Sequence, residues 1–470
     1  MAKHKNSHKL KNKLIYRTPQ KIIRTQSHVM QVFKFGGTSV GTPERMKDVC
    51  KLITDDGTPK IVVLSAMSGT TNSLVEIADY VRKGNPEGAG IIITHLRRKY
   101  RAHIPELYAT EEMRQCTRQL IDNIFLDIHD LCSLKFSDSI EKEILSKGEL
   151  ISTNMVTNYL KEQHVKAVLI PALEYMKIDR NGEPDMHYIR EHLKHQLNAN
   201  PGYDIYITQG FICRNAAGEV DNLQRGGSDY TATLIGASIR AEEVQIWTDI
   251  DGMHNNDPRF VEGTTPVRQL NFEESAELAY FGAKILHPTC IQPARIAGVP
   301  VRLKNTMDPF APGTIINNEM QEGTIKAVAA KDHITAIKIV SSRMLLASGF
   351  LCKVFSIFDK YKTPIDMITT SEVGVSVTID KTSRLAAIVE RLKKIGTVQV
   401  DHEMCIICVV GDLRSENTGF ETVATEALRD VPLRMISYGG SNHNISFLIS
   451  MDDKQRALQA LQDTIFAKSE

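Results

Sequence analysis

Residues 34–41 read Lys34-Phe35-Gly36-Gly37-Thr38-Ser39-Val40-Gly41, and this stretch decides how the N-terminal part of the chain folds. An apolar run, Gln31–Phe35, leads into it with the composition of a strand, and a helical pattern over Pro43–Thr54 follows it. Glycines after a strand let the backbone approach an anion, and the N–H groups at a helix start point at that anion. Lys34 precedes the glycines, so the stretch is not a G-x-x-x-x-G-K-S/T loop. Taken alone, it fits an anion-binding loop and a tight glycine turn about equally well.

The alternation of strand and helix continues outward from this loop to about Asn305. Short apolar runs separated by helical patterns are typical of a parallel sheet with crossover helices. The expected strands are Gln31–Phe35, Lys60–Ser65, Val165–Pro171, Tyr203–Thr208, Val244–Thr248 and Val299–Lys304. The sequence therefore predicts an α/β domain in this part of the chain.

A second polar loop, 65–72, also follows an expected strand and precedes a helix over Ser73–Val81. Hydroxyl groups at the carboxyl end of a parallel strand suit a polar ligand. Helix capping by Thr71 or Asn72 explains the same residues equally well.

A third loop, 224–230, runs into an apolar helix over Ala232–Ile239. The guanidinium of Arg225 offers two parallel donors to a carboxylate, and the glycines after it leave the backbone open beside a helix start. Asp229 suits an ammonium group or a neighbouring cationic side chain. An acid in the first turn of a helix is the alternative reading of Asp229.

Two further segments carry charged residues near the ends of elements. Thr248-Asp249 closes an apolar strand, and Asp257-Pro258-Arg259 follows a few residues later. Phe281-Gly282-Ala283-Lys284 ends one helical pattern shortly before another. Lys284 has the reach to contact a nucleotide, although a cation at a helix C-terminus is the alternative.

The C-terminal part has a different pattern, because two segments after about Thr324 repeat with a period of roughly 70 residues. Each reads strand, helix, strand, strand, helix, from Ala336 to Lys394 and again from Cys405 to Ile465. Neither copy carries a dense set of titratable groups, which favours ligand sensing or pairing over chemistry. The Cys405-Ile-Ile-Cys408 spacing lies in an apolar strand without a second Cys or His pair, so we expect core packing and no metal site.

Composition excludes several classes of protein. The chain has 470 residues, 42% hydrophobic and 24% charged, which is typical of a globular protein of about three folding units. No apolar run approaches the roughly 18 residues of a membrane span, so no membrane partner is expected. Eight scattered Cys are too few for a disulfide framework, which favours reduced thiols and a cytoplasmic location.

Residues 1–29 carry eight Lys or Arg and no acidic residue. We expect a disordered basic N-terminal extension, because the segment has almost no apolar periodicity. Nucleic-acid binding through this arm is the alternative, and it predicts an affinity that falls steeply with salt.

The combined motifs resemble aspartokinases, over residues 30 to about 465. The motifs occur in the order found in that family: Lys34-Phe35-Gly36-Gly37-Thr38-Ser39, Gly148-Glu149-Leu150, Arg225-Gly226-Gly227-Ser228-Asp229, Thr248-Asp249 with Asp257-Pro258-Arg259, and Phe281-Gly282-Ala283-Lys284. The pattern is most similar to the monofunctional, lysine-sensitive type. The resemblance implies a three-layer αβα amino-acid-kinase fold with a mainly parallel sheet, followed by two α+β ferredoxin-like ACT domains. The expected domains are the catalytic domain over residues 30–318 and ACT domains over 333–400 and 401–470, with a strand at 325–332 as an alternative addition to the second.

The implied reaction transfers the γ-phosphoryl group of Mg-ATP to the β-carboxylate of L-aspartate, giving L-4-aspartyl phosphate. This is the first step of lysine, threonine and methionine biosynthesis, with diaminopimelate on the lysine branch. We expect Mg²⁺ to be held mainly by the nucleotide phosphates. Phosphoryl transfer needs positioning and charge neutralisation rather than a strong base, and a lysine beside glycine N–H groups meets that demand.

By resemblance, the site residues fall into four sets. The catalytic residues would be Lys34, Gly37 and Asp229. Aspartate would be bound by Ser39, Thr71, Glu149, Arg225 and Ser228, with Arg225 on the α-carboxylate and Glu149 on the α-amino group. ATP would contact Lys34, Phe35, Gly36, Gly37, Thr248, Asp249, His254, Arg259, Lys284 and Ile285. An amino-acid effector would contact Met344, Ala347, Phe350, Leu351, Asp366, Ser371 and Glu372.

The sequence departs from the family pattern at two places. His254-Asn255 stand where Tyr-Thr is frequent on the adenine side, and Leu346-Ala347 replace a more polar His-Ser pair in the effector pattern. L-Lysine is the expected effector, with threonine or no effector as alternatives. A homodimer, or a dimer of dimers, through the ACT domains is the family expectation.

Two alternatives to an aspartate kinase stay open at this point. One is a related kinase of another amino acid, carbamate or a nucleotide. The other is a catalytically silent ACT-type amino-acid sensor, which would bind ATP without transferring phosphate.

Overall fold

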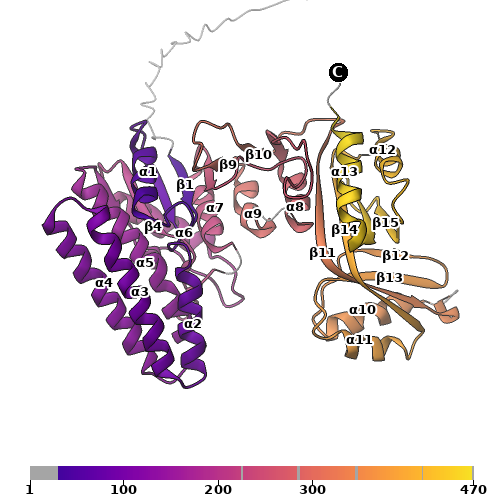
Figure 1. The fold of residues 1–470 in the computed structure, drawn as a ribbon, viewed down its shortest axis with the longest axis horizontal. Helices are drawn as coiled ribbons and strands as arrows, with labels where there is room; N and C mark the ends of the chain where they lie inside the picture. The colour runs from indigo at the N-terminus through magenta and orange to yellow at the C-terminus, as the bar shows by residue number, and fades with distance from the viewer. Residues whose placement is uncertain (1–29, 224–225, 283–285, 345–347, 415, 468–470) are drawn as a thin grey trace, which may run out of the picture.

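The computed structural model describes residues 30–223, 226–282, 286–344, 348–414 and 416–467. An α/β part made by residues 30 to about 320 lies beside a C-terminal sheet with its own helices (Figure 1). Helix α8 (Phe272–Tyr280) lies between the two parts.

An eight-stranded sheet forms the centre of the N-terminal part, in the order β3-β4-β2-β1-β7-β9-β10-β8. All neighbouring strands are parallel except β9 and β10. Its strands are β1 (Gln31–Phe35), β2 (Lys60–Leu64), β3 (Ala167–Leu169), β4 (Ile205–Gln209), β7 (Val244–Thr248), β8 (Gln269–Asn271), β9 (Val301–Asn305) and β10 (Thr314–Asn317). A separate hairpin is made by β5 (Ile212–Arg214) and β6 (Val220–Asn222).

Helices cover both faces of this sheet, which confirms the three-layer αβα prediction. Alternate residues of β2 belong to two different cores, Ile61 and Val63 to one and Val62 and Leu64 to the other. The helices are α1 (Pro43–Thr54), α2 (Thr70–Arg82), α3 (Pro86–Leu107), α4 (Glu111–Cys132), α5 (Asp138–Glu162), α6 (Met186–Ala199), α7 (Gly227–Ile239), α8 and α9 (Pro288–Ala297). Buried residues of α1 to α5 lie in the core with Val62, and those of α6 to α9 lie in the core with Ile61.

The expected strands lie close to the observed ones, and the differences have local causes. β1, β7 and helix α1 have the predicted bounds. The strand predicted over Val165–Pro171 shortens to Ala167–Leu169, since Pro171 has no N–H for a strand ladder. Strands β8 and β10, of three and four residues, were not predicted because such short segments show no clear period.

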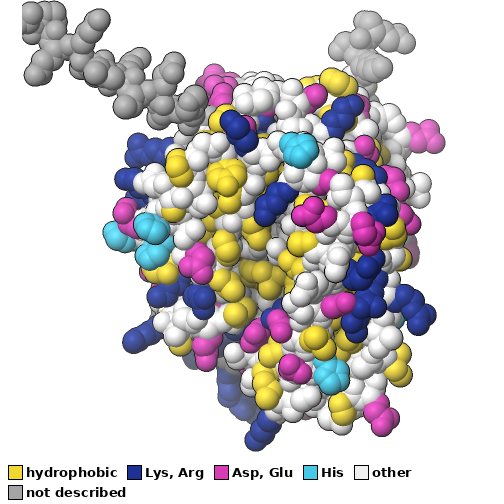
Figure 2. All heavy atoms as spheres, turned by 90° about the vertical axis from the view of Figure 1, so that its left-hand side faces the viewer, with side chains coloured by type: hydrophobic (Ala, Val, Ile, Leu, Met, Phe, Trp, Pro, Cys, Tyr) yellow, Lys and Arg dark blue, Asp and Glu magenta, His cyan; other side chains and the backbone are white. Residues whose placement is uncertain are grey.

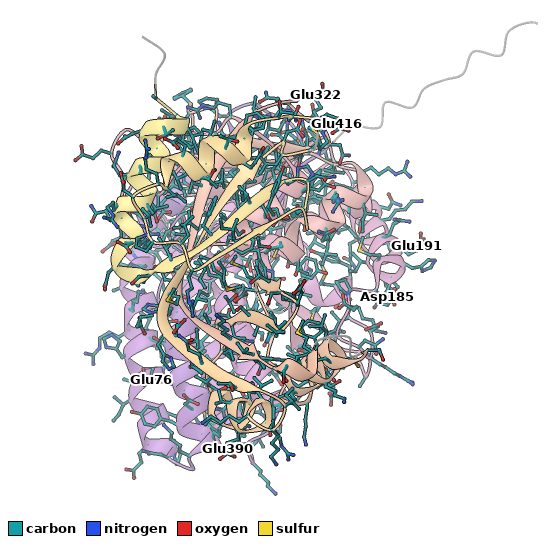
Figure 3. The ribbon with its side chains drawn as sticks, turned by 90° about the vertical axis from the view of Figure 1, so that its right-hand side faces the viewer. Glu76, Asp185, Glu191, Glu322, Glu390 and Glu416 are labelled. Atoms are coloured by element: carbon teal, nitrogen blue, oxygen red, sulfur yellow. The ribbon has the colours of Figure 1, made fainter. Side chains whose placement is uncertain are left out.

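A six-stranded antiparallel sheet forms the C-terminal part, in the order β12-β13-β11-β14-β16-β15. Its strands are β11 (Ile325–Val340), β12 (Ile368–Thr370), β13 (Gly374–Ile379), β14 (Thr397–Gly411), β15 (Met435–Tyr438) and β16 (Asn444–Ser450). Its helices are α10 (Phe350–Lys360), α11 (Leu385–Leu392), α12 (Phe420–Ala427) and α13 (Lys454–Ile465). Figure 3 looks onto this part, with α12 and α13 above and α10 and α11, which carries Glu390, below.

The two long strands β11 and β14 run through both repeats. The first half of β11 pairs with β14 near its end, Ile325 opposite Gly411, and its second half pairs with β13 as well. Both strands bend at the same level, where His333 and Glu403 have positive φ values of 56° and 49° and the register shifts. The two repeats therefore share one continuous sheet, with one core under α10 and α11 and another under α12 and α13.

Cys405 and Cys408 are both buried in β14, and their side chains join two different cores. Positions three apart in a strand point to opposite faces, so the two thiols do not face a common metal position.

Helix α8 packs on the face of this sheet opposite to α12 and α13. One hydrophobic core holds residues of α8, such as Leu278, together with Ala329 of β11 and Ile406 of β14. The α/β part and the C-terminal sheet are therefore joined through a shared core.

Figure 2 shows the end of the molecule formed by the α/β part, where acidic and basic side chains are mixed over the surface. Within the described ranges, no helix combines the length and the apolar character needed to cross a bilayer.

Candidate active site

An ion pair joins two of the predicted catalytic residues. Lys34, near the end of β1, places its Nζ 2.6 Å from Oδ1 of Asp229 in the first turn of α7. The side chains are 12% and 15% exposed, so the pair is largely desolvated. Gly226, with φ 72°, is the N-cap of α7, and Asp229 therefore holds a lysine rather than capping the helix.

The glycine loop after β1 packs tightly against the loop after β2. Gly36 N donates to Trp247 O of β7 at 3.4 Å, and Ser68 N donates to Gly37 O at 3.1 Å. A Cβ at Gly37 would lie 2.8 Å from Ala66 O, a contact that real Cβ atoms do not make. The sequence needs glycine here because two loop backbones touch.

Glu149, on α5, contacts the loop after β2. Its side chain is buried, 4% exposed, and Oε1 accepts a hydrogen bond from Ala66 N at 3.1 Å. Oε2 has no hydrogen-bond partner among the residues that the structure describes. Burial raises the pKa of Glu149 to about 7, against the backbone hydrogen bonds, which lower it. This carboxyl group is placed to accept a buried cation.

Hydroxyl groups link the strand ends to one another. Ser39 Oγ lies 2.8 Å from Thr306 Oγ1 after β9, and Ser65 Oγ donates to Ser228 Oγ at 2.9 Å. Thr71 is exposed in the first turn of α2. The N-cap of α2 is Gly69, with φ 81°, so the alternative reading of Thr71 or Asn72 as the cap is wrong.

The residues predicted for the nucleotide lie along β7 and the loop after it. Thr248 Oγ1 donates to Asp249 Oδ1 at 3.1 Å, and Thr306 N donates to Thr248 O at 2.7 Å. His254 is partly buried, and its Nδ1 lies 3.2 Å from Thr264 Oγ1. Burial lowers the pKa of His254. This places Thr248 and Asp249 at the strand ends that carry Lys34 and Ser39.

Arg259 has a different environment. It is 71% exposed, and Asp257 accepts two hydrogen bonds from it, at 2.9 and 2.6 Å. The ring of Phe260 beside it lies under Lys454 Nζ of α13, 3.9 Å away. The described contacts of Arg259 therefore lie next to the C-terminal part.

Phe35 is fully buried and stacks on Trp247, with ring centroids 5.7 Å apart. Three predicted site residues, Arg225, Lys284 and Ile285, lie outside the described residues. The same is true of Ala347 in the effector set.

A cavity of about 610 Å³ lies beside the start of α7, lined among others by Lys142, Phe211 and Gly227. Phe211 has φ 68°, which is uncommon for a bulky side chain, and its N–H bonds Thr231 Oγ1 at 3.0 Å. The cavity therefore opens at Gly226 and Gly227, at the start of the helix that carries Asp229.

Several residues at the site were not among those predicted. Ser65, Thr306 and Phe211 contact or face the predicted residues, and Lys99 Nζ holds the Ser68 carbonyl at 3.1 Å. Ser65 belongs to the polar loop 65–72, which the sequence already indicated for a polar ligand, and Thr306 could have been found as a polar residue directly following a strand. Nothing in the sequence marks Phe211 or Lys99.

In the part of the chain that the structure describes, no group of three His, Cys, Asp or Glu side chains is placed to hold a metal ion. The site instead offers a cation, Lys34, beside a glycine backbone that leaves no room for a side chain at Gly37. A cation beside a closely packed glycine backbone suits the phosphate groups of a nucleotide.

The predicted effector residues lie in the first repeat of the C-terminal part. Phe350 is buried and Leu351 partly buried at the start of α10, and Met344 is partly buried in the turn before it. Ser371 and Glu372 are exposed in the turn between β12 and β13. Asp366 is buried and contacts Lys331 and Tyr280.

Comparison with known proteins agrees with this architecture. The model of the amino acid kinase family matches residues 30–305, and an ACT domain model matches residues 407–465. The chain therefore belongs to the amino acid kinase family.

Individual relatives place the chain more narrowly within this family. Lysine-sensitive aspartokinase 3 of Escherichia coli is 33% identical over 93% of this chain and 99% of its own length. Aspartokinase 1, chloroplastic, of Arabidopsis thaliana is 34% identical over 93% of this chain and 80% of its own.

Solved structures give the same result. E. coli aspartokinase III in complex with aspartate and ADP, in the R-state, has a TM-score of 0.79 at 32% identity, covering 93% of this chain and 100% of that one. The same enzyme with lysine and aspartate, in the T-state, gives 0.78 at 33% identity, with coverage of 93% and 99%. Within the amino acid kinase family, the chain is an aspartokinase, which confirms the predicted resemblance.

Proposed function

We propose that this chain transfers the γ-phosphoryl group of ATP to the β-carboxylate of L-aspartate. A carboxylate oxygen attacks the γ-phosphorus, a new P–O bond forms, and the bond from that phosphorus to the β,γ-bridging oxygen breaks. ADP leaves, and no proton has to move, because the carboxylate is already ionised at pH 7. The observation that carries the proposal is the largely desolvated Lys34–Asp229 pair beside the packed glycine loop.

Each residue has a role that follows from its position. Lys34 would neutralise charge on the moving phosphoryl group, with Asp229 fixing its Nζ. The free oxygen of Glu149 would accept the α-ammonium group of aspartate, and Arg225 would bind the α-carboxylate. Mg²⁺ would enter on the ATP phosphates and offset their charge there. Thr248 and Asp249, with Lys284 and Ile285, would contact the nucleotide.

The test is ATP-dependent acyl phosphate formation from L-aspartate, trapped with hydroxylamine, with L-glutamate as control. We expect hydroxamate from aspartate only. ATP binding by a folded protein that forms no acyl phosphate would favour the amino-acid sensor, and product from glutamate would favour a kinase of another amino acid.

The effector is a further part of the proposal. E. coli aspartokinase III has been solved with lysine, and Asp366 offers this chain a buried carboxylate for an ammonium group. We propose L-lysine as a feedback inhibitor. Adding L-lysine or L-threonine separately to the hydroxamate assay distinguishes the two candidates.

We also propose a homodimer through the C-terminal part, acting in the cytoplasm. The edge strands β12 and β15 leave Ile368, Ile436 and Tyr438 exposed, which suits pairing with a second copy. In this arrangement residues 30–318 form the catalytic domain and residues 333–400 and 401–470 the ACT domains.

The pH dependence of aspartate use tests the role of Glu149. Only its ionised form attracts the ammonium group, and its pKa in the free protein is about 7. We expect kcat/KM for aspartate to fall about tenfold per pH unit below 7. In Glu149→Gln this slope should vanish and KM should rise.

Stability gives an independent reading of the same group. A carboxyl whose pKa is raised on folding destabilises the folded state as pH rises from about 4.5 to about 7. Glu149→Gln should therefore raise the free energy of unfolding at pH 8 relative to wild type, and not at pH 4. An equal effect at both pH values would contradict the raised pKa.

A further inference from the structure

Residues 306–313 form the loop between β9 and β10, and both ends of this loop bond to the segment that follows β7. At the start of the loop, Thr306 N donates to Thr248 O at 2.7 Å. At its end, Gly313 N donates to Asp251 Oδ1 at 3.2 Å. The loop therefore lies beside the end of β7, which carries residues predicted to contact the nucleotide.

A lysine holds the middle of this loop. Lys304 Nζ, on β9, donates to Pro309 O at 2.9 Å and to Ala311 O at 2.6 Å. The same ammonium group lies 5.3 Å from the centre of the buried Trp247 ring. The backbone on both sides of Phe310 is therefore fixed by hydrogen bonds to one side chain.

Phe310 is presented to solvent by this fixed backbone. Among the large hydrophobic side chains of the described ranges, Phe310 is the most exposed, at 97%. Met307 on the same loop is 49% exposed, and Ile250 in the segment after β7 is 40% exposed. Apolar side chains at the rim of a ligand site suit an apolar part of the ligand.

The charges on these two segments are mostly acidic. Asp249 and Asp308 are exposed, and Asp251 is 24% exposed with its Oδ2 3.1 Å from Arg268 Nη1. Carboxylates repel phosphate groups, and the cation proposed for the phosphoryl group, Lys34, lies on β1. The part of ATP that suits the surface beside Phe310 is therefore the uncharged base, whose aromatic face can stack on a phenyl ring.

We propose that Phe310 stacks on the adenine base of ATP and is a specificity-determining residue of the nucleotide site. This inference rests on the proposed function, since it assigns the position of the base in the same site. Stacking removes the exposed face of the ring from water. It orders little additional chain, because Lys304 already holds the loop.

Phe310→Ala tests the contact, and its exposure means that the fold does not depend on it. We expect KM for ATP to rise about tenfold, with kcat and KM for aspartate within about twofold of wild type. Phe310→Tyr keeps the ring and should retain the KM of wild type. Ile296→Ala is the matched control, because Ile296 is 85% exposed on α9, at the opposite end of β9 from the loop. Unchanged KM for ATP in Phe310→Ala overturns the inference.

Inorganic tripolyphosphate separates the base from the phosphates, because it carries the phosphate chain and no base. As a competitor of ATP, it should have the same inhibition constant with wild type and with Phe310→Ala, within about twofold. An equal loss of affinity for ATP and for tripolyphosphate would mean that Phe310 acts on the phosphate end, which overturns stacking.

Phe310→Trp reports the contact without turnover. The chain has one tryptophan, Trp247, which is 4% exposed, so the new indole would be the exposed one. We expect ATP to quench its fluorescence and tripolyphosphate to leave it unchanged. An indole that ATP does not quench overturns the inference.

The outcomes also separate this inference from the function. Wild type that forms no acyl phosphate overturns the proposed function, while quenching of Phe310→Trp by ATP still supports stacking. Sedimentation of Phe310→Ala tests the rival occupant, a second copy of the chain. A changed oligomeric state with unchanged KM for ATP would assign the exposed ring to that contact and overturn the inference.

Discussion

Replacing Lys34 by methionine is expected to lower kcat by about 10³-fold while the chain remains folded. The side chain is only 12% exposed and its Nζ lies 2.6 Å from Asp229 Oδ1, so it has a fixed position at the end of β1. Methionine keeps the length and apolar character of the side chain and removes the charge. The loss should therefore appear in the chemical step, measured by hydroxamate formation at saturating aspartate and ATP.

The substitution also leaves the Asp229 carboxylate without its cation, which destabilises the folded state. A double variant, Lys34→Met with Asp229→Asn, separates the two effects. We expect it to recover most of the thermal stability and none of the activity. Lys47→Met is a control on α1, because Lys47 Nζ bonds the Glu106 carbonyl at 2.6 Å. Lys34→Met activity within tenfold of wild type would contradict the assigned role.

The sequence predicts the edge at which the site forms, because the carboxyl ends of parallel strands meet on one side of a sheet. Lys34, Ser39 and Thr248 all lie in or just after strands, and the structure joins Ser39 to Thr248 through Thr306, while Lys34 lies on β1 beside β7. Which of these residues lie close together depends on the order of the strands in the sheet. Such positions are visible in a sequence.

Contacts made by helices far along the chain were not visible in the same way. Glu149 lies in the middle of a 25-residue helix, and only the fold places its carboxyl group 3.1 Å from Ala66 N. The raised pKa of Glu149 follows from that burial, which no local pattern encodes. The motif Gly148-Glu149-Leu150 identifies Glu149 as a candidate site residue, but the ionisation of its carboxyl group depends on tertiary packing.

The joint between the two parts was also beyond a sequence reading. Residues 325–340 were expected as separate short strands, whereas β11 is one strand of 16 residues that both repeats share. Strand length is poorly specified where polar residues such as Lys331 and Asp332 interrupt an apolar pattern. The sequence shows that α8 has an apolar face, but it does not show that this face packs on the C-terminal sheet.

The α/β part and the C-terminal part meet at a second place, besides the packing of α8 on the C-terminal sheet. The loop after β7, which carries predicted nucleotide residues, bonds to the C-terminal part through its backbone and side chains. Val328 N donates to Asn255 O at 2.8 Å, Asn256 Nδ2 to Leu458 O at 3.0 Å, and Gln462 Nε2 to Gly263 O at 3.1 Å. The loop after β7 therefore rests on β11 and α13, and Gly282, two residues before Lys284 in the sequence, packs on β11.

Gly282→Ala is expected to raise KM for ATP by about tenfold or more, because the new Cβ would lie 2.0 Å from Ala330 O. Two backbones cannot both keep their places, so the segment leading to Lys284 must move away from β11. Gly263→Ala is the matched control, since Gly263 also has a positive φ, 74°, but open space around its Cβ position. Backbone strain adds to the cost of both variants and is larger at Gly282, whose φ of 119° lies beyond the left-handed helical region in which Gly263 sits.

Both the larger strain and the clash at Gly282 displace the backbone of this segment from β11, and neither displacement is expected at Gly263. A larger KM for ATP in Gly282→Ala than in Gly263→Ala, at similar kcat, would mean that ATP binding by the segment after Gly282 depends on the C-terminal sheet. Equal values would mean that the segment finds its ATP-binding position without that support. In that case coupling would have to pass through the loop that Asn256 anchors on α13.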